Sequence, residues 1–403
     1  MHSSNPYKPT IAVILSRFPY PLEKGDKLRA YFQLVDLAKV FDIHLICTTE
    51  KEIQKNDFEK ILKLCKTVHV FKLKRMNLFL NLCWAIVDSK PFQVRYFYQK
   101  WIQKAINQIL KDVQPSHIYC QLIRSSEYVK NHHSCPKTLD YMDALSKGME
   151  RRINHVWGIK KMIFKSEYKR LAKYERLIFD YFENHTIISK QDRNYMMHPQ
   201  REQIILVPNG VDNQFFETVT TEKKFELLFT GNMGYPPNID AAMLIEKEII
   251  PELTSKNIFL KCLISGVNPH PSLKALSTEN FKVNGWVEDI RESYASAEIF
   301  IAPMMIGTGL QNKLLEAMAM GLPCITSTLA NNALLAKPEK EILIADDAKS
   351  FADQIERLLN DPILFKEISE AGKSFVKANF QWSSANGVLI GRILRHKTID
   401  TRH

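Results

Sequence analysis

The segment best suited to carry chemistry is residues 302–327, APMMIGTGLQNKLLEAMAMGLPCITS. The Gly-Thr-Gly of 307–309 is expected between a strand and a helix. A turn that leads into a helix N-terminus presents unpaired backbone N–H groups and the positive end of the helix dipole to an anion. Lys313 and Glu316 follow at a spacing of three, which places both on one helix face. Such a cation suits a diphosphate, and such a carboxylate suits ribose hydroxyls.

A simpler interpretation is a glycine-flanked turn followed by an intrahelical ion pair between Lys313 and Glu316. Such a pair stabilises a helix by roughly a few tenths of a kcal/mol. The residues alone leave both interpretations open.

Polar residues near the start of the chain form a second candidate group. Gly25, Asp26 and Lys27 are expected in the loop after the first strand, and functional residues concentrate in such loops. The alternative for them is a solvated surface turn. Arg29 is either a surface charge of the next helix or an inward-facing cation.

A third group follows later strands of the first half. Asp140 and Asp143 end a predicted strand, where open α/β sheets place ligands, so they are candidates for the acceptor side. Their alternative role is to cap the helix that follows. Arg124 and Glu127 are interpreted as a local ion pair.

Strands and helices alternate along both halves of the chain, which predicts parallel sheets covered by helices. Strands are predicted at 11–16, 43–49, 67–73, 116–122, 138–142 and 185–190, then at 225–231, 258–266, 281–287, 298–304 and 324–327. Predicted helices include 28–41 and 238–253.

The 403 residues exceed what one core usually spans, so two domains are expected. Pro208 and Asn209-Gly210 interrupt the periodicity and favour a turn. We predict an N-terminal domain of 1–206, a C-terminal domain of 207–382, and a last helix in 383–403 that is long enough to return to the first domain.

Composition narrows the class of protein. Hydrophobic residues make up 45% and charged residues 25%, which is typical of a globular chain. The net charge of +11 predicts an anionic partner, such as a nucleotide sugar or an anionic lipid surface. No nucleic-acid-binding motif is present, so nucleic acid is not predicted as a partner. Seven cysteines without a CxxC pair favour reduced thiols in a cytoplasmic protein.

Neither a membrane span nor a metal site is predicted. The apolar stretch 78–87 is about half as long as a spanning helix. The histidines at 132 and 133 have no partner at ligand spacing. The segment 150–176 carries nine Lys or Arg and three Glu among aromatic residues. It is either a surface that lies on an anionic membrane or a solvated helix face.

The segment 307–327 resembles the donor-binding segment of retaining glycosyltransferase family four, which has the GT-B fold. Other parts of the chain are similar to the same family or to a bacterial subgroup associated with exopolysaccharide and sortase-like sorting clusters. They include VPNGVD (207–212), LLFTG (227–231), NGWVEDIRESYASAEIFIAP (284–303), FPYPLEKGDKLRAY (18–31) and LDYMDALSKGMERR (139–152). The resemblance covers nearly the whole chain.

The resemblance implies the α/β class and the GT-B architecture, with two Rossmann-like domains whose parallel sheets face a cleft. It implies transfer of a sugar from a nucleotide sugar to a glycan or lipid-linked glycan, with retained configuration, in cell-surface or extracellular polysaccharide synthesis. No metal or other cofactor is expected, and the chain has no DxD sequence. The enzyme is expected to be cytoplasmic, with peripheral contact with the inner face of the membrane.

The resemblance also assigns residues. The donor site is assigned to Gly231, Asn232, Gly307, Thr308, Gly309, Leu310, Asn312, Lys313 and Glu316. The donor or acceptor loop is assigned to Gly25, Asp26, Lys27 and Arg29. We predict catalytic roles for Lys313, Glu316 and Asp26.

The chain departs from the family pattern at two places. The first of two family glutamates is replaced by Thr308, and a family basic pair is replaced by Asn232 and Pro237. The alternatives are therefore a nucleotide-sugar epimerase or hydrolase on the same fold, or a binding protein that lost activity. The absence of a clustered acidic or histidine base weighs against the first of these.

Overall fold

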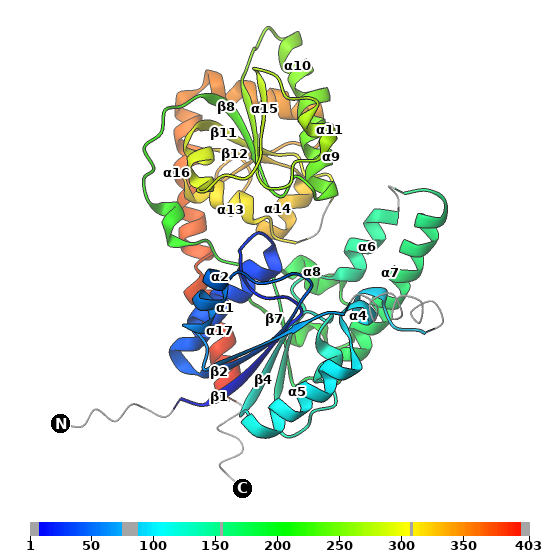
Figure 1. Cartoon of the computed structure of the whole chain (residues 1–403). Helices are drawn as coiled ribbons and strands as arrows, with labels where there is room; N and C mark the ends of the chain where they lie inside the picture. Colours follow the sequence, from blue (N-terminus) through cyan, green and yellow to red (C-terminus); the bar gives the residue numbers. More distant parts are fainter. Residues whose placement is uncertain (1–7, 75–87, 154–155, 307–308, 396–403) are drawn as a thin grey trace, which may run out of the picture. The chain divides into compact units, whose positions relative to one another are not determined.

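The computed structural model describes residues 8–74, 88–153, 156–306 and 309–395. The chain forms two compact units, one of 1–208 together with 383–403 and one of 209–382. Each unit contains one parallel β-sheet (Figure 1).

The N-terminal unit has a seven-stranded sheet in the order β3-β2-β1-β4-β5-β6-β7. Its strands are β1 (Thr10–Leu15), β2 (Asp42–Thr49), β3 (Thr67–Lys72), β4 (His117–Gln121), β5 (Lys137–Asp140), β6 (Asn184–Ile187) and β7 (Ile205–Leu206). The strand order reverses between β1 and β4. In open parallel sheets, ligands bind outside the carboxyl ends of the strands at such a switch point.

The apolar run of β1 is continuous because both of its faces are buried. Ile11 and Val13 pack in one cluster with Leu34, whereas Ala12 and Ile14 pack in another cluster on the opposite face. The helices of this unit are α1 (Gly25–Val40), α2 (Lys55–Leu62), α4 (Phe92–Phe97), α5 (Lys100–Val113), α6 (Leu145–Ile153), α7 (Gly158–Phe179), α8 (Lys190–Tyr195) and α17 (Trp382–Arg395).

The last helix, α17, belongs to the N-terminal unit from Ser383 onward. Its Asn386 is completely buried, and its side-chain amide donates hydrogen bonds to the carbonyl of Phe32 (3.1 Å) and to Asp36 Oδ2 (2.7 Å), both on α1. These bonds attach α17 to α1.

The C-terminal unit has a six-stranded sheet in the order β10-β9-β8-β11-β12-β13. Its strands are β8 (Phe225–Thr230), β9 (Cys262–Ser265), β10 (Phe281–Asn284), β11 (Ala297–Ala302), β12 (Cys324–Thr326) and β13 (Leu343–Ile344). Its helices are α9 (Pro236–Leu244), α10 (Ile250–Ser255), α11 (Pro271–Lys274), α12 (Ile290–Ala295), α13 (Asn312–Ala319), α14 (Thr328–Leu334), α15 (Ala348–Asn360) and α16 (Pro362–Asn379). The switch point lies between β8 and β11.

The predicted α/β class with parallel sheets is confirmed, and each predicted strand is present. The predicted helix 238–253 is divided, because a π-helical turn at Ile245–Ile249 separates α9 from α10. The stretch 78–87 lies outside the described residues. No helix in the described ranges is long and apolar enough to span a membrane.

Helix α1 begins earlier than predicted. Gly25, Asp26 and Lys27 form its first turn and not the preceding loop. The N-cap residue, Lys24, makes no side-chain capping bond, so the sequence carries no capping signal at the true start of the helix.

Candidate functional site

Lys313 lies in the first turn of α13, which follows β11 at the switch point of the C-terminal sheet. Its Nζ donates a hydrogen bond to Asn238 Oδ1 (2.6 Å) and lies 4.4 Å from the centre of the Phe229 ring. No salt bridge to it is found among the described residues. Burial lowers the pKa of Lys313 to about 7, although the nearby Glu316 opposes this shift. Glu316 thus acts on the amine only at a distance, without a direct bond.

Glu316 is held one turn further along the same helix. Its Oε2 accepts a hydrogen bond from the hydroxyl of Tyr294 (2.8 Å), which also lies 2.7 Å from Thr230 Oγ1. Burial raises the pKa of Glu316 to about 7, while the Tyr294 hydrogen bond and Lys313 lower it. Each residue thus has its own partner, and the intrahelical ion pair considered for Lys313 and Glu316 does not form.

Gly231 provides space for the lysine. It directly follows β8 with φ +151°, and a Cβ there would lie 3.2 Å from Lys313 Nζ and 2.7 Å from Asn238 Nδ2. Its N–H is already donated to the carbonyl of Ser265 (3.1 Å). Gly231 therefore contributes room near the switch point, and its N–H is already used within the sheet.

Neighbouring donor-site candidates are held by local bonds. Asn232 accepts a hydrogen bond from the Gly234 amide on Oδ1 (3.0 Å), and its carbonyl accepts one from Asn238 Nδ2 (2.9 Å). Pro237 is buried in the first turn of α9. The side chain of Asn232 therefore helps to shape the loop that positions Asn238.

The loop before α13 is described only in part. Gly307 and Thr308 lie outside the described residues. Gly309 is buried with φ +83°, in the left-handed region that favours glycine. Leu310 is half-buried, and Asn312 Oδ1 accepts a hydrogen bond from Asn209 Nδ2 (3.0 Å).

The candidates at the start of α1 have different partners from one another. Asp26 Oδ2 pairs with Arg17 Nη1 at 2.5 Å, and Lys27 pairs with Glu23 at 3.1 Å. Burial raises the pKa of Asp26, but Arg17 and other cations outweigh it and hold this pKa below its usual value. A carboxylate with a lowered pKa is a poor base near neutral pH. Asp26 is thus better suited to hold Arg17 than to accept a proton. Gly25 has no side chain that could contact a ligand.

Asp140 has a structural role. Arg29 and Asp140 are both completely buried, and they form a bidentate pair with distances of 2.7 and 3.0 Å. Asp140 also accepts a hydrogen bond from Thr186 Oγ1 (2.9 Å) and lies 2.9 Å from the Tyr119 hydroxyl. Arg29 is therefore the inward-facing cation. The assignment of Asp140 to the acceptor side is wrong, because no part of its carboxylate is accessible.

Asp143 remains a candidate on the acceptor side. It is half-buried, and burial together with Asp192 raises its pKa to about 8. It does not cap α6, because the amide of Ser146 donates to Glu175 Oε1 (3.0 Å) and that of Ala144 to Asp192 Oδ1 (3.3 Å). The capping alternative for Asp143 is wrong for this reason.

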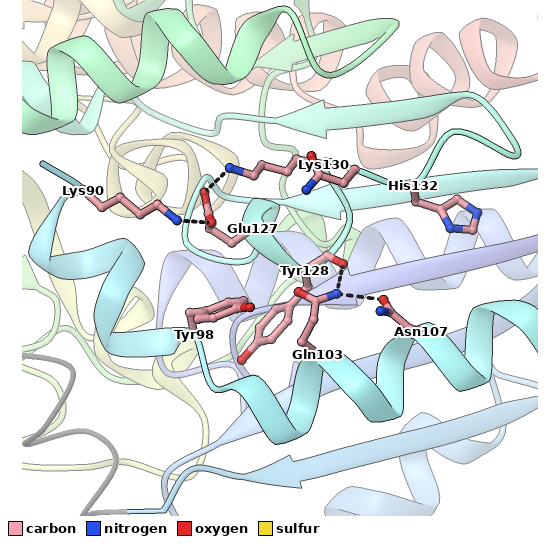
Figure 2. A pocket seen from close by; sticks show the side chains of 9 residues that line it. Lys90, Tyr98, Gln103, Asn107, Glu127, Tyr128, Lys130 and His132 are labelled. Atoms are coloured by element: carbon pink, nitrogen blue, oxygen red, sulfur yellow. Dashed lines mark hydrogen bonds and ion pairs between the residues drawn. The ribbon is translucent and has the colours of Figure 1, made fainter. Parts of the chain in front are cut away.

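A cavity of about 560 Å³ in the N-terminal unit is lined by polar groups that bond to one another (Figure 2). Glu127 pairs with both Lys90 (2.6 Å) and Lys130 (2.9 Å), so its predicted ion pair with Arg124 does not form. Gln103 donates to Asn107 and to the carbonyl of Tyr128. The two lysines, Glu127 and the amides of Gln103 and Asn107 are thus bonded within the cavity wall.

Sequence reasoning missed Asn238 and Tyr294, which orient Lys313 and Glu316. They come from α9 and α12, and no spacing rule connects them with α13. It also missed Arg17, whose only signal is that it stands just beyond the end of the first predicted strand.

Residues 224–361 match the family model of glycosyl transferases group 1. An uncharacterized 44.6 kDa protein in the cps region of Klebsiella pneumoniae is 23% identical over 397 residues, which cover 92% of this chain and 96% of that protein. The UDP-Gal:alpha-D-GlcNAc-diphosphoundecaprenol alpha-1,3-galactosyltransferase of Escherichia coli is 24% identical over 320 residues, with coverage of 72% and 81%.

Among solved structures, sucrose-phosphate synthase from Thermosynechococcus elongatus has a TM-score of 0.69 at 16% identity, covering 97% of this chain and 100% of that one. This likeness confirms the GT-B fold, with two Rossmann-like units. The family model and the relatives, and not this likeness, identify the protein as a glycosyltransferase of the hexosyltransferase type. Membership of retaining family four and of the bacterial subgroup stays a prediction.

Proposed function

We propose that this glycosyltransferase moves a hexosyl unit, with retained configuration, from a nucleotide sugar to a glycan or lipid-linked glycan in cell-surface or extracellular polysaccharide synthesis. The observation that carries the donor assignment is the placement of Lys313 and Glu316. A cation without a salt bridge and a carboxylate held by Tyr294 lie on one helix face at the switch point of the C-terminal sheet. The relatives in Escherichia coli and in the cps region of Klebsiella pneumoniae favour the polysaccharide context.

In this proposal Lys313 binds the diphosphate and Glu316 accepts the ribose hydroxyls. When the bond from the anomeric carbon to the diphosphate oxygen breaks, the electron pair moves to the diphosphate. Lys313 stabilises this developing negative charge. The acceptor hydroxyl forms the new bond on the same face of the sugar, and its proton goes to the departing diphosphate oxygen.

We propose that the reaction needs no metal ion or other cofactor. The half-buried amine of Lys313 can supply positive charge beside the leaving diphosphate. No three His, Cys, Asp or Glu side chains gather into a possible metal site in the described ranges.

We also propose that the α6–α7 pair contacts an anionic membrane, where a lipid-linked acceptor would be located. The two helices pack side by side (Figure 1). Around the start of α7 the large apolar side chains are exposed, with accessible fractions of 83% for Trp157, 76% for Ile159 and 73% for Met162. The exposed lysines beside them are Lys160, Lys161 and Lys165. Apolar side chains beside cations suit an interface of lipid headgroups and acyl chains.

A binding screen tests the donor assignment. Melting temperatures would be measured with UDP-, GDP-, ADP- and CMP-sugars. A ligand at about 100 times its Kd should stabilise the fold by roughly 2.7 kcal/mol. The assignment requires that stabilisation by the active sugar nucleotide be reduced by Glu316→Gln. An equal shift in the wild type and the variant would contradict the donor site placed here.

A further inference from the structure

Two arginines of the N-terminal unit lie at the switch point of its sheet. Arg17 follows β1 and Arg124 follows β4, the neighbouring parallel strands between which the strand order reverses. Both guanidinium groups lie near the same buried ring, since their Cζ atoms are 5.4 and 5.8 Å from the centre of Phe97. Two cations are therefore gathered where an open sheet of this kind binds its ligand.

The two arginines differ in their partners. Arg17 forms its ion pair with Asp26. Arg124 is half-buried, and its Nε and Nη2 donate to the neutral Gln93 Oε1 at 3.1 and 2.6 Å. Across the described ranges, no carboxylate forms a salt bridge with Arg124. Burial, followed by repulsion from Arg17, lowers the pKa of Arg124 to about 10.

This arrangement leaves the charge of Arg124 only partly compensated, because Asp26 and Asp143 act on it without a direct bond. A half-buried charge that bonds only to a neutral amide retains much of its desolvation cost. A nearby anion would offset that cost and would also reduce the repulsion between the two guanidinium groups. The bonds to Gln93 fix the plane of Arg124, and its remaining N–H groups have no partner among the described residues. Guanidinium groups bind phosphate oxygens through such paired N–H groups.

We propose that Arg124 and Arg17 form an anion site that binds a phosphate group of the acceptor, with Asp26 positioning Arg17. The proposal rests on the transferase function proposed above. The donor diphosphate already has Lys313 in the C-terminal unit. A sugar hydroxyl is uncharged and has no need of an arginine, whereas a phosphate or diphosphate on the acceptor would bind both guanidinium groups.

Binding of inorganic pyrophosphate to the full-length protein tests the anion site without turnover. The titration uses a Lys313→Ala background, in which the donor site is weakened. Arg124→Gln in that background should weaken pyrophosphate binding roughly tenfold to a hundredfold. Arg357→Gln, on the surface of α15 and with the same change of charge, is the matched control and should leave the affinity unchanged. Equal affinities in all three proteins would overturn the anion site.

Steady-state kinetics then show whether the phosphate that binds at Arg124 belongs to the acceptor or to the donor. With the otherwise wild-type enzyme, Arg124→Gln should raise the KM for the acceptor by a similar factor and leave the KM for the donor unchanged. A rise in donor KM alone would overturn the acceptor assignment. If Arg124→Gln lowers the melting temperature, Arg124→Lys replaces it. Lysine keeps the charge and loses the paired N–H groups, so pyrophosphate affinity and acceptor KM should both still worsen.

Discussion

Donor binding should depend on pH because its two proposed contacts both titrate near neutrality. The pKa of Lys313 is lowered to about 7 and that of Glu316 is raised to about 7, in each case chiefly by burial. The diphosphate needs the protonated lysine, and the ribose hydroxyls need the ionised glutamate. Affinity should therefore fall above pH 7 as Lys313 loses its proton, and below pH 7 as Glu316 gains one.

The size of the effect follows from the fraction of protein in the competent form. With both pKa values at about 7, only part of the protein is in this form at pH 7, and the fraction falls on either side. The apparent Kd scales with its inverse, so affinity should fall severalfold within one to two pH units on either side of neutrality. The phosphates of a nucleotide sugar stay ionised over this range, so the change belongs to the protein.

Glu316→Gln tests the acidic side of this dependence of donor affinity on pH. The amide keeps an oxygen for the Tyr294 hydroxyl but can no longer ionise. At pH 8 the loss of charge-assisted hydrogen bonds should weaken donor binding by about 1.5–3 kcal/mol, roughly tenfold to a hundredfold. The decline in acid should disappear, while the alkaline decline remains and begins at a lower pH, because Glu316 no longer raises the pKa of Lys313.

Lys313 should affect the chemical step as well as binding. Lys313→Arg, which keeps its charge, should remove the decline above pH 7. Lys313→Ala should lower kcat as well as raise the donor KM, because the diphosphate carries more charge in the transition state.

The assay is calorimetric titration of the stabilising nucleotide sugar between pH 5 and 9, followed by donor kinetics. Glu370→Gln, at an exposed position of α16, is the matched control and should behave as wild type. A flat wild-type profile, or a Glu316→Gln profile that still declines in acid, would refute the assignment.

Three further outcomes are expected. Activity should survive EDTA, and loss of turnover that Mg²⁺ or Mn²⁺ restores would show that a metal is required. Replacing Lys160, Lys161 and Lys165 by Glu should reduce sedimentation with anionic vesicles, as should added salt, whereas unchanged partitioning would favour a solvated helix face. Asp140→Asn should destabilise the fold by about 3–5 kcal/mol, because it leaves the buried Arg29 without its counter-charge. A melting temperature equal to that of the wild type would contradict the structural role of this pair.

Local patterns predicted the strands well, because buried strands are short apolar runs between turn residues. They also placed Lys313 and Glu316 on one helix after β11. Strands β7 and β13 escaped prediction because each has only two residues, too few to show alternation. The Gly-Asp-Lys start of α1 contains no apolar residue and no capping side chain, so its periodicity became visible only from Leu28 onward.

Pairings between distant side chains could not be predicted from one sequence. Arg29 and Asp140 are separated by 111 positions, and their contact depends on how α1 packs against the sheet. At the start of α6, two carboxylates could accept the capping hydrogen bond. Asp143 stands where a capping residue is expected, yet Glu175 from α7 accepts the bond, and only the packing of the two helices decides between them.

The switch points of the two sheets carry a common arrangement of charge. Lys313 bonds to the amide oxygen of Asn238, and Arg124 bonds to that of Gln93. A carboxylate in either place would neutralise the cation and stabilise the fold by itself. An amide orients the cation and leaves its charge available, and at Asn238 its nitrogen also donates to the carbonyl of Asn232, which a carboxylate could not do. Burial therefore disfavours the charged form at both positions, and it lowers the pKa of Lys313 and that of Arg124. An anion that binds at either switch point would offset the cost of burying the cation. This gain would add to the free energy with which the anion binds.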